Sequence, residues 1–219
     1  YYEASVVHEL MLLARQLGFS PILVPFKPNG KPQHVKGFLQ QFAKTASDTA
    51  AFLNQLHELG IPMVGIDPSL VLCYRDEYKT VVGEQRGDFN VLLVHEWLAT
   101  LSNKPQVKQD KEYVLFGHCT EKTMLAQSEK QWQNIFTEFG LTLKVESVGC
   151  CGMAGTFGHE ATHLQESLTL FDMSWEKPVS QYQPSQILAT GYSCRSQVAR
   201  IKQFKPRHPL QVLSEQLSR

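Results

Sequence analysis

The stretch Gly149–Gly155 reads GCCGMAG, a glycine-rich turn that contains two adjacent cysteines, Cys150 and Cys151. Two further cysteines flank it, Cys119 earlier in the chain and Cys194 later. Each of these segments follows a short apolar stretch that is typical of a strand. Thiolates are soft ligands that suit iron–sulfur clusters, zinc or Cu(I). Buried core cysteines would explain one such residue, but a vicinal pair in a glycine turn favours a metal or cluster site.

Around this turn, short apolar strands alternate with helices, so we predict an α/β fold with parallel sheets and right-handed crossovers. In the second half we expect strands at 113–116, 143–148 and 186–189, and helices at 120–139, at 160–171 and from Arg195 onward. Ligands of such sheets gather at the carboxyl ends of the strands. The cysteines named above all follow these strand ends, which places the predicted metal site there.

The first half has a similar pattern. We expect helices at 5–17, 35–59, 70–82 and 89–101, strands at 21–26 and 62–66, and a polar linker at 103–111. The turn at Asp67–Leu70 falls where Gly191–Cys194 falls in the second half, which suggests an internal duplication into two Rossmann-like halves. Cys73 then aligns with Gln197, so we interpret Cys73 as a packing residue or a relic, not a ligand.

The duplication predicts three parts of the chain. Residues 1–86 would form a first, degenerate repeat, whose first strand would lie before Tyr1. Residues 87–112 would form a linker with a helix, and residues 113–219 the second repeat with the cysteine ligands.

Composition excludes several classes of protein. Lysine plus arginine and aspartate plus glutamate number 21 each, so no basic field is present to hold nucleic acid or an anionic membrane. The odd count of five cysteines argues against a secreted disulfide framework and for a reducing, cytoplasmic location. No apolar stretch approaches the roughly 20 residues of a membrane helix. The start lacks a signal peptide and an initiator Met, as expected of a fragment.

The segments around the cysteines resemble the cysteine-rich CCG domain of heterodisulfide reductase and of the iron–sulfur component of glycolate oxidase. The matching pieces are Gly117–Cys119 with Lys122, Gly149–Glu160, and Ser193–Gln197. Three other segments resemble the fused FAD-linked dehydrogenases of the D-lactate and D-2-hydroxyglutarate type, in which such a domain is the C-terminal part: Tyr1–Ala4, Pro25–Val35 and Asp67–Tyr78. The resemblance covers nearly the whole chain.

The resemblance implies the ligands of a cluster or metal: Cys119, Cys150, Cys151 and Cys194. Four thiolates suit one [4Fe–4S] cluster or a tetrahedral zinc. The chain departs from the family pattern at Gln197, where the fuller form has another cysteine. It departs again at Lys27–Gly30, where the first repeat would carry its own doubled cysteine. These departures argue against a second metal site in the first half and against a noncubane double cluster.

The function implied by this resemblance is electron transfer. We expect an iron–sulfur domain of a larger FAD-linked 2-hydroxy acid dehydrogenase, of the D-2-hydroxyglutarate or D-lactate type, that is not catalytic alone. FAD would be bound by another domain of the same polypeptide, with flavin and ferredoxin-like domains upstream. The resemblance does not identify the electron acceptor, and it leaves open whether the longer enzyme contacts the inner face of the membrane peripherally. No catalytic residue is identified, because no nucleophile elbow or dinucleotide fingerprint occurs. The alternatives are a zinc-binding structural or docking module and a docking domain with empty cysteines.

Several other residues are candidates for cofactor binding. Backbone N–H groups of Gly152 and Gly155 and the Thr156 hydroxyl would donate to cluster sulfurs, although the same loop also fits a plain helix start. His118 is a candidate ligand or proton relay, but a strand-end histidine bonded to backbone is favoured. Lys122 would offset the negative charge of a thiolate cluster, or would be a solvated helix residue.

The segment His159–His163 matches H-E-x-x-H, the pattern of zinc metalloproteases. On a helix its two imidazoles would share one face, with the glutamate as general base. Such an enzyme also needs an open cleft and a third ligand, and the one later histidine, His208, lies beside Pro209 in the tail. A metallohydrolase is therefore a remote alternative.

Overall fold

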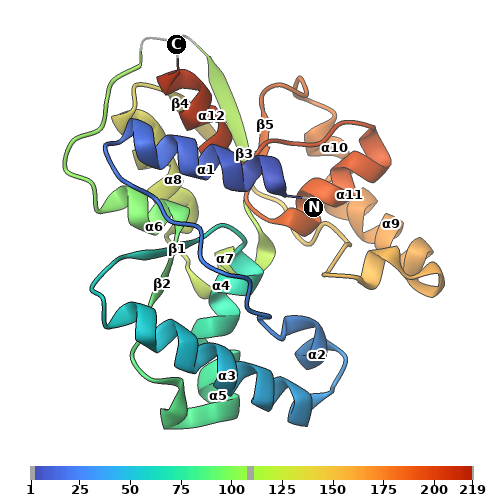
Figure 1. Ribbon diagram of the computed structural model, residues 1–219. Helices are drawn as coiled ribbons and strands as arrows, with labels where there is room; N and C mark the ends of the chain where they lie inside the picture. Colours follow the sequence, from blue (N-terminus) through green and yellow to red (C-terminus); the bar gives the residue numbers. More distant parts are fainter. Residues whose placement is uncertain (1–2, 108–110, 219) are drawn as a thin grey trace. The chain divides into compact units, whose positions relative to one another are not determined.

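The fold is taken from a computed structural model that describes residues 3–107 and 111–218 (Figure 1). The chain forms two compact units. Tyr1–Ile22 and Leu98–Arg219 together make the large unit, and Leu23–Trp97 makes the small unit. This division differs from the boundaries expected at 86/87 and 112/113, because the first helix of the chain packs into the large unit.

The large unit is built on a three-stranded parallel sheet in the order β4–β3–β5. Its strands are β3 (Glu112–Phe116), β4 (Thr142–Glu146) and β5 (Ile187–Ala189). Leu115 of the central strand pairs with Val145 on one side and with Leu188 on the other. Residues Tyr113–Phe116 are all buried, as expected where helices cover both faces of a parallel sheet. The predicted α/β class with parallel strands is confirmed.

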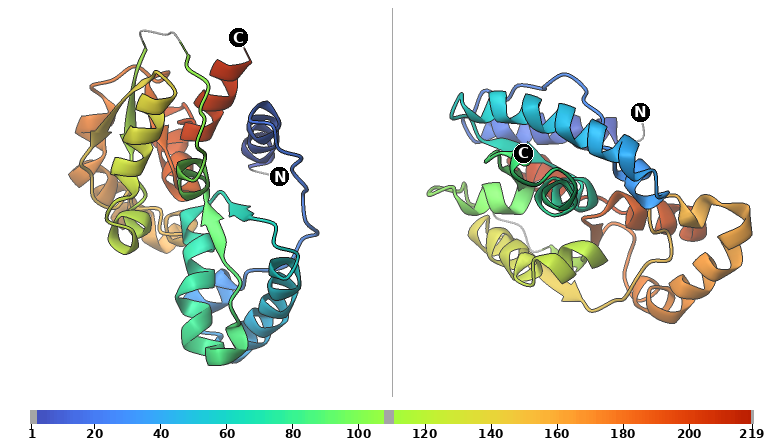
Figure 2. Two further views of the ribbon diagram at one scale, coloured as in Figure 1. Left: turned by 90° about the vertical axis from the view of Figure 1, so that its left-hand side faces the viewer. Right: turned by 90° about the horizontal axis from the view of Figure 1, so that it is seen from below.

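Helices surround this sheet. They are α1 (Ala4–Gln16), α7 (Cys119–Met124), α8 (Ser128–Glu138), α9 (Leu164–Ser174), α10 (Glu176–Val179), α11 (Tyr192–Lys202) and α12 (Pro209–Leu217). α1 packs against α12 (Figures 1 and 2), with Leu13 fully buried. Gln16 Nε2 donates to Ser214 O at 3.2 Å and to Ser218 Oγ at 2.7 Å. α12 was not predicted from the sequence, and its docking holds the N-terminal helix in the large unit.

Two predicted helices of the large unit are shorter than expected. The helix expected at 120–139 is divided into α7 and α8, because Leu125 leaves the helical conformation, with φ −132° and ψ 76°. The helix expected at 160–171 begins only at Leu164, after the 3₁₀ turns η2 (Phe157–His159) and η3 (Ala161–His163). Glu160, between these turns, is extended, with φ −77° and ψ 126°, and so interrupts the helical ladder.

The small unit is mainly helical. Its elements are α2 (Lys31–Val35), α3 (Leu39–His57), β1 (Met63–Gly65), α4 (Pro68–Arg75), α5 (Glu77–Val82), η1 (Gly83–Arg86), β2 (Val91–Leu93) and the start of α6 (Val94–Ala99). β1 and β2 pair in parallel. Phe42 of α3 and Tyr78 of α5 are fully buried, with ring centroids 5.8 Å apart. The Asp67 carboxylate caps α4 by accepting the Ser69 N–H at 3.0 Å.

Two elements expected in the first half are wrong. Residues 21–26 form no strand, and Ile22 and Phe26 are 76% and 88% exposed. An apolar run forms a strand only when a neighbouring strand pairs with its backbone N–H and C=O groups. The sequence of the run does not show whether such a neighbour is present. Residues 89–101 form no continuous helix, because Val91–Leu93 pairs as β2 before α6 begins.

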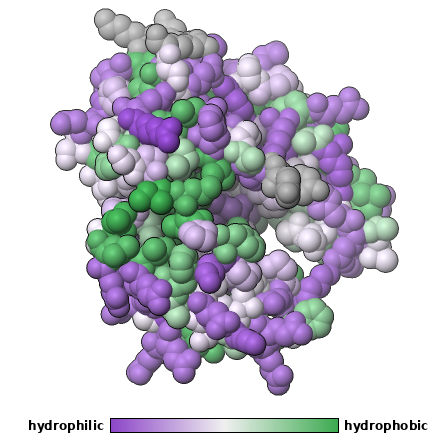
Figure 3. All heavy atoms as spheres, in the orientation of Figure 1, coloured by the Kyte–Doolittle hydropathy of each residue, from purple (hydrophilic) through white to green (hydrophobic). Residues whose placement is uncertain are grey.

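Apolar side chains are exposed in and beside residues 21–26. Figure 3 shows apolar residues gathered on the face that it draws. The exposed ones between residues 19 and 26 are Phe19, Ile22, Leu23, Val24 and Phe26. Across residues 3–107 and 111–218, no helix combines the length and the apolar composition needed to cross a bilayer. The internal duplication stays a prediction, since parallel strands in both units do not by themselves establish a repeat.

Candidate metal centre

The four cysteines of the second half lie at the carboxyl ends of three neighbouring parallel strands. Cys119 begins α7 directly after β3, and Cys150 and Cys151 occupy the loop after β4. Cys194 lies in the first turn of α11, after β5. Because the carboxyl ends of parallel strands meet at one edge of a sheet, the fold brings these distant residues together.

The thiols of these residues contact one another. Hydrogen bonds with Cys119 and then Cys151 lower the pKa of Cys150 far below its ordinary value. The hydrogen bond with Cys150, and then burial, raise the pKa of Cys119, and hydrogen bonds with Cys150 and Cys194 raise that of Cys151. A negative charge on one of these thiols thus disfavours ionisation of its neighbours, because adjacent negative charges repel. All four could ionise together only beside a cation or a cluster that compensates their charge.

The hydrogen-bonded contacts join Cys119 to Cys150, Cys150 to Cys151, and Cys151 to Cys194. None of the five cysteines, all of which lie within the described residues, forms a disulfide. Within residues 3–107 and 111–218, no group of three or more His, Cys, Asp or Glu side chains is arranged to hold a metal ion. The predicted ligand set thus meets as neighbours, and its role as a ligand set stays a prediction.

The site has a buried side and an accessible side. Cys151 and Cys194 are 3% and 1% exposed and belong to the apolar core, whose aromatic members include Phe116, Phe171 and Trp175. Cys119 and Cys150 are only partly buried. A group held by all four residues would therefore be screened from water on one side and approachable on the other.

Backbone N–H groups surround the sulfurs. The Gly152 N–H donates to Cys150 Sγ at 3.4 Å. The Thr120 N–H bonds to the Cys119 sulfur and the Met153 N–H to the Cys151 sulfur, and both bonds favour the thiolate. These donors are of the kind expected beside cluster sulfurs.

The other predicted donors of this loop are placed differently. Gly155 has φ +68° and contributes a left-handed turn to the loop. The Thr156 hydroxyl lies 3.5 Å from Glu160 Oε1. The structure therefore supplies the predicted type of donor chiefly through Thr120, Gly152 and Met153.

Three side chains that sequence reasoning missed form a hydrogen-bonded group beside Gly152 of the turn, here termed the Ser167 clamp: Ser167, Gln197 and Arg200. Gln197 Nε2 donates to Ser167 O at 3.2 Å and to its Oγ at 3.0 Å. Arg200 donates to Ser167 Oγ at 2.9 Å and to Gln197 Oε1 at 2.6 Å, and it also reaches Gly158 O. Gln197, noted only as a missing cysteine, is thus a buried structural residue. The sequence feature that could have predicted this role is the position of Gln197, a polar residue one turn after Cys194 on the same helix face.

The start of the turn is also anchored. Trp175 Nε1 donates to Gly149 O at 3.0 Å, and the Gly149 N–H donates to Ser174 Oγ at 2.7 Å. The Lys122 ammonium donates to Val148 O. Lys122 thus connects α7, which begins with Cys119, to the chain just before Cys150. The prediction that Lys122 offsets the charge of a thiolate cluster did not include this contact.

His118 is buried beside the thiols. The backbone N–H of His118 donates to Thr190 Oγ at 3.1 Å, and its ring Nε2 lies 3.4 Å from Ser193 Oγ. A Cβ on Gly191 would lie 2.1 Å from the His118 ring, so only glycine fits there. The positive charge of a protonated His118 contributes to the lowered pKa of Cys150. The histidine is thus held by two side-chain hydroxyls of the neighbouring loop, and its ligand, relay and backbone-bonded roles stay predictions.

The H-E-x-x-H segment does not have the geometry of a metalloprotease. His159 and His163 lie on separate 3₁₀ turns with an extended Glu160 between them, so they do not share a helix face. The His163 ring stacks on Phe157 with centroids 4.3 Å apart, and its Nδ1 lies 3.2 Å from Glu160 Oε2. The expected helical placement of this motif is wrong.

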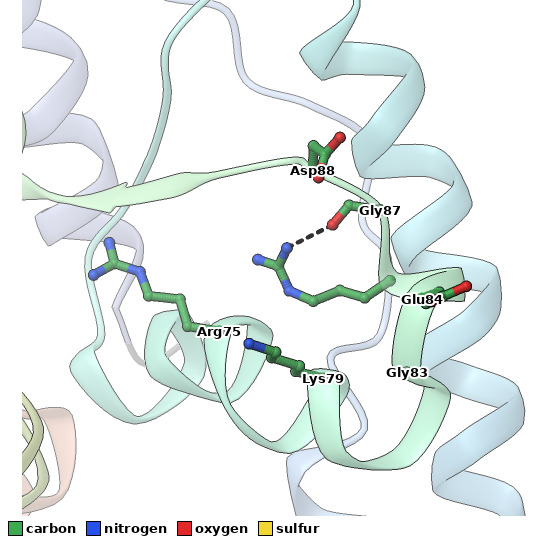
Figure 4. A pocket seen from close by; sticks show the side chains of 7 residues that line it. Arg75, Lys79, Gly83, Glu84, Gly87 and Asp88 are labelled. Carbon is green, nitrogen blue, oxygen red and sulfur yellow. Dashed lines mark hydrogen bonds between the residues drawn. The ribbon is translucent and has the colours of Figure 1, made fainter.

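Two further features belong to the small unit. Cys73 is fully buried, and burial raises its pKa to about 11, as suits a packing residue. A cavity of about 670 Å³ is lined by Arg75, Lys79, Gly83, Glu84, Arg86, Gly87 and Asp88 (Figure 4). Arg75 pairs with Glu96. Arg86 donates to the carbonyl oxygens of Tyr74, Gly87 and Phe89. Both guanidinium groups thus already have hydrogen-bond partners within the small unit.

Known relatives match nearly the whole chain. It is 55% identical to a D-2-hydroxyglutarate dehydrogenase of Pantoea ananatis over 98% of this chain and 21% of that protein. It is 54% identical to the protein of the same name from Escherichia coli K12, over 98% and 21%. For that of Haemophilus influenzae, identity is 50% over 99% and 22%. The chain thus spans about a fifth of the length of the curated relatives it matches. No family model matches it, and no solved structure does.

Proposed function

We propose that the chain is the iron–sulfur electron-transfer part of a longer FAD-linked D-2-hydroxyglutarate dehydrogenase. The observation that carries this proposal is the mutual contact of thiols from three neighbouring strand ends: Cys119, Cys150, Cys151 and Cys194. The names of the relatives support the activity of the parent enzyme. The small share of their length that matches supports a part that works with other parts of a longer polypeptide.

The chemistry of the donor set fits a [4Fe–4S] cluster. Such a cluster takes four cysteine thiolates, and its potential is tuned by burial and by N–H groups that donate to sulfur. When bound, it supplies a one-electron carrier between the flavin and an acceptor. Cys151 and Cys194 would hold it from the apolar core, which excludes water, and Cys119 and Cys150 would hold its accessible side. The Ser167 clamp would keep the turn in place during electron transfer.

The proposal is tested by anaerobic purification, an absorbance spectrum, and an iron, sulfide and zinc assay of one sample. We expect about four iron and four sulfide per chain, with colour that fades under dithionite. Colourless protein with one zinc would contradict electron transfer and favour a structural module. Cys150→Ser should lose most of the iron, whereas the control Cys73→Ser, in the small unit, should keep it.

A second experiment tests the parent activity. The longer enzyme is mixed anaerobically with D-2-hydroxyglutarate, and the flavin and cluster bands are followed by stopped-flow absorbance. We expect the flavin to be reduced first and the cluster afterwards. In the Cys150→Ser enzyme, flavin reduction should persist while the slower cluster phase disappears. Reduction of the flavin with no change at an intact cluster would contradict the proposed electron path.

A further inference from the structure

A buried positive charge follows one of the proposed ligands in the chain, and its guanidinium bonds Thr190, whose hydroxyl accepts the backbone N–H of His118 beside Cys119. Arg195 follows Cys194 directly and is 0% exposed. Its Nη1 donates to Ala189 O at 2.9 Å and to Thr190 O at 2.7 Å, at the carboxyl end of β5. Arginine stays protonated in proteins, so this charge needs a compensating anion within the fold.

That anion is Glu3, which comes from the opposite end of the chain. Its carboxylate accepts a hydrogen bond from Arg195 Nη2, across 192 residues of sequence. The same carboxylate accepts from Lys205 Nζ at 2.7 Å. Lys205 is partly exposed, with 41% of its side-chain area accessible, whereas Arg195 is buried. Glu3 precedes α1, so the packing of α1 on α12 holds it in place.

We propose that Glu3 is a positioning residue that sets the net charge beside the thiol centre through Arg195, and thereby its reduction potential. This inference rests on the proposed electron-transfer function, because it requires a redox centre at the thiols. Reduction of a thiolate-bound centre adds one negative charge. A buried guanidinium favours that reduced form, and a carboxylate paired with it opposes this effect. The pair therefore holds the potential lower than the guanidinium alone would.

The same reasoning gives opposite signs for a change at Glu3 and a change at its second partner, Lys205. Glu3→Gln keeps the shape and the hydrogen bond to Arg195 but removes the compensating charge, so the potential should rise. Lys205→Met keeps an apolar stem but removes a cation that competes for Glu3, so the potential should fall by a smaller amount, because Lys205 is partly solvated. A purely structural role would loosen the pair in both variants without this reversal of sign.

The measurement is an anaerobic dithionite titration of the intact chain, followed by absorbance, for wild type and variants. For Glu3→Gln we expect the equilibrium constant for reduction to rise about tenfold, which is about 59 mV for a one-electron couple. Glu215→Gln is the matched control. It breaks the ion pair with Arg207, at 2.7 Å, and Arg207 bonds Ser185 O, before the start of β5 and away from the cysteines. This control should leave the potential unchanged.

The outcomes separate the inference from the function on which it rests. A wild-type protein without a reducible centre overturns both. A reducible centre whose potential does not respond to Glu3→Gln, or that shifts in the same direction in Glu3→Gln and Lys205→Met, overturns the inference alone. Glu3→Asp should bring the potential back towards that of wild type. If Glu3→Gln fails to fold, Lys205→Met decides the question, and a potential that does not fall contradicts the proposal.

Discussion

At the scale of single residues, Gly152 limits what the cysteine turn can tolerate. It has φ +84°, and a Cβ there would lie 2.1 Å from Ser167 O. We expect Gly152→Ala to lower the free energy of unfolding by at least about 2 kcal/mol, since backbone strain and a backbone clash combine. Urea unfolding measures the loss.

The control for this change is Gly155→Ala. Gly155 also has a left-handed φ, +68°, but nothing lies within 4 Å of its Cβ position. Only the strain remains, about 1 kcal/mol. Equal losses in the two variants would show that contact with Ser167 does not restrain the turn.

Cys73 makes stability depend on pH. Burial raises its pKa from 9.0 to about 11, so the folded state holds the thiol proton more tightly than the unfolded chain does. The stabilising contribution is complete below pH 9 and is lost as the pH rises towards 11, by up to roughly 3 kcal/mol. Urea unfolding at several pH values between 8 and 11 should show this decline.

Cys73→Ala supplies the comparison, because it removes the titrating thiol. We expect the wild type to lose more stability than this variant between pH 9 and pH 11. Parallel curves for the two proteins would mean that Cys73 titrates normally in the folded state.

At the scale of elements, the Ser167 clamp joins α9 to α11 behind the thiols. Gln197→Leu would leave Ser167 O and Oγ and the Arg200 guanidinium with fewer partners in a buried place. We expect it to cost about 1–3 kcal/mol of unfolding free energy and to lower the iron content after anaerobic reconstitution. Thermal unfolding and the iron assay measure both effects.

Gln165→Leu is the control on α9, since Gln165 is exposed. It should change neither quantity appreciably. Iron content that stays at the wild-type level in Gln197→Leu would mean that the clamp supports the helices but not the centre.

The elements also show where local patterns suffice. The strands beside the cysteines were predicted within about two residues, because buried parallel strands are short apolar runs ended by turns. The run at 21–26 has the same local pattern and forms no strand. The difference lies in the presence of a neighbouring strand, which no window of sequence encodes. Similarly, α7 and α8 were predicted as one helix, but Leu125 leaves the helical conformation between them.

At the scale of the whole molecule, the division of the chain predicts which segments unfold together. Leu13 of α1 is fully buried in the large unit. Leu13→Ala should destabilise that unit by about 2–5 kcal/mol. Hydrogen exchange should then show faster exchange in β3, β4 and β5, with little change in α3.

Phe42→Ala makes the reciprocal test, because Phe42 is fully buried in the small unit. It should speed exchange in α3 and leave β3 protected. Faster exchange in α3 but not in β3 after Leu13→Ala would favour the boundaries expected from the duplication over the division seen in the structure.

The sequence by itself determined the α/β class and the grouping of Cys119, Cys150, Cys151 and Cys194, because strand periodicity, turn residues and ligand type are local properties. Only the tertiary structure decided that α1 belongs to the large unit, that Gln197 bonds Ser167 beside the cysteine turn, and that Glu3 pairs with Arg195. The physical reason is the same in each case. These contacts join residues far apart in the chain, and burial and charge pairing between such residues become defined only when the fold brings them together.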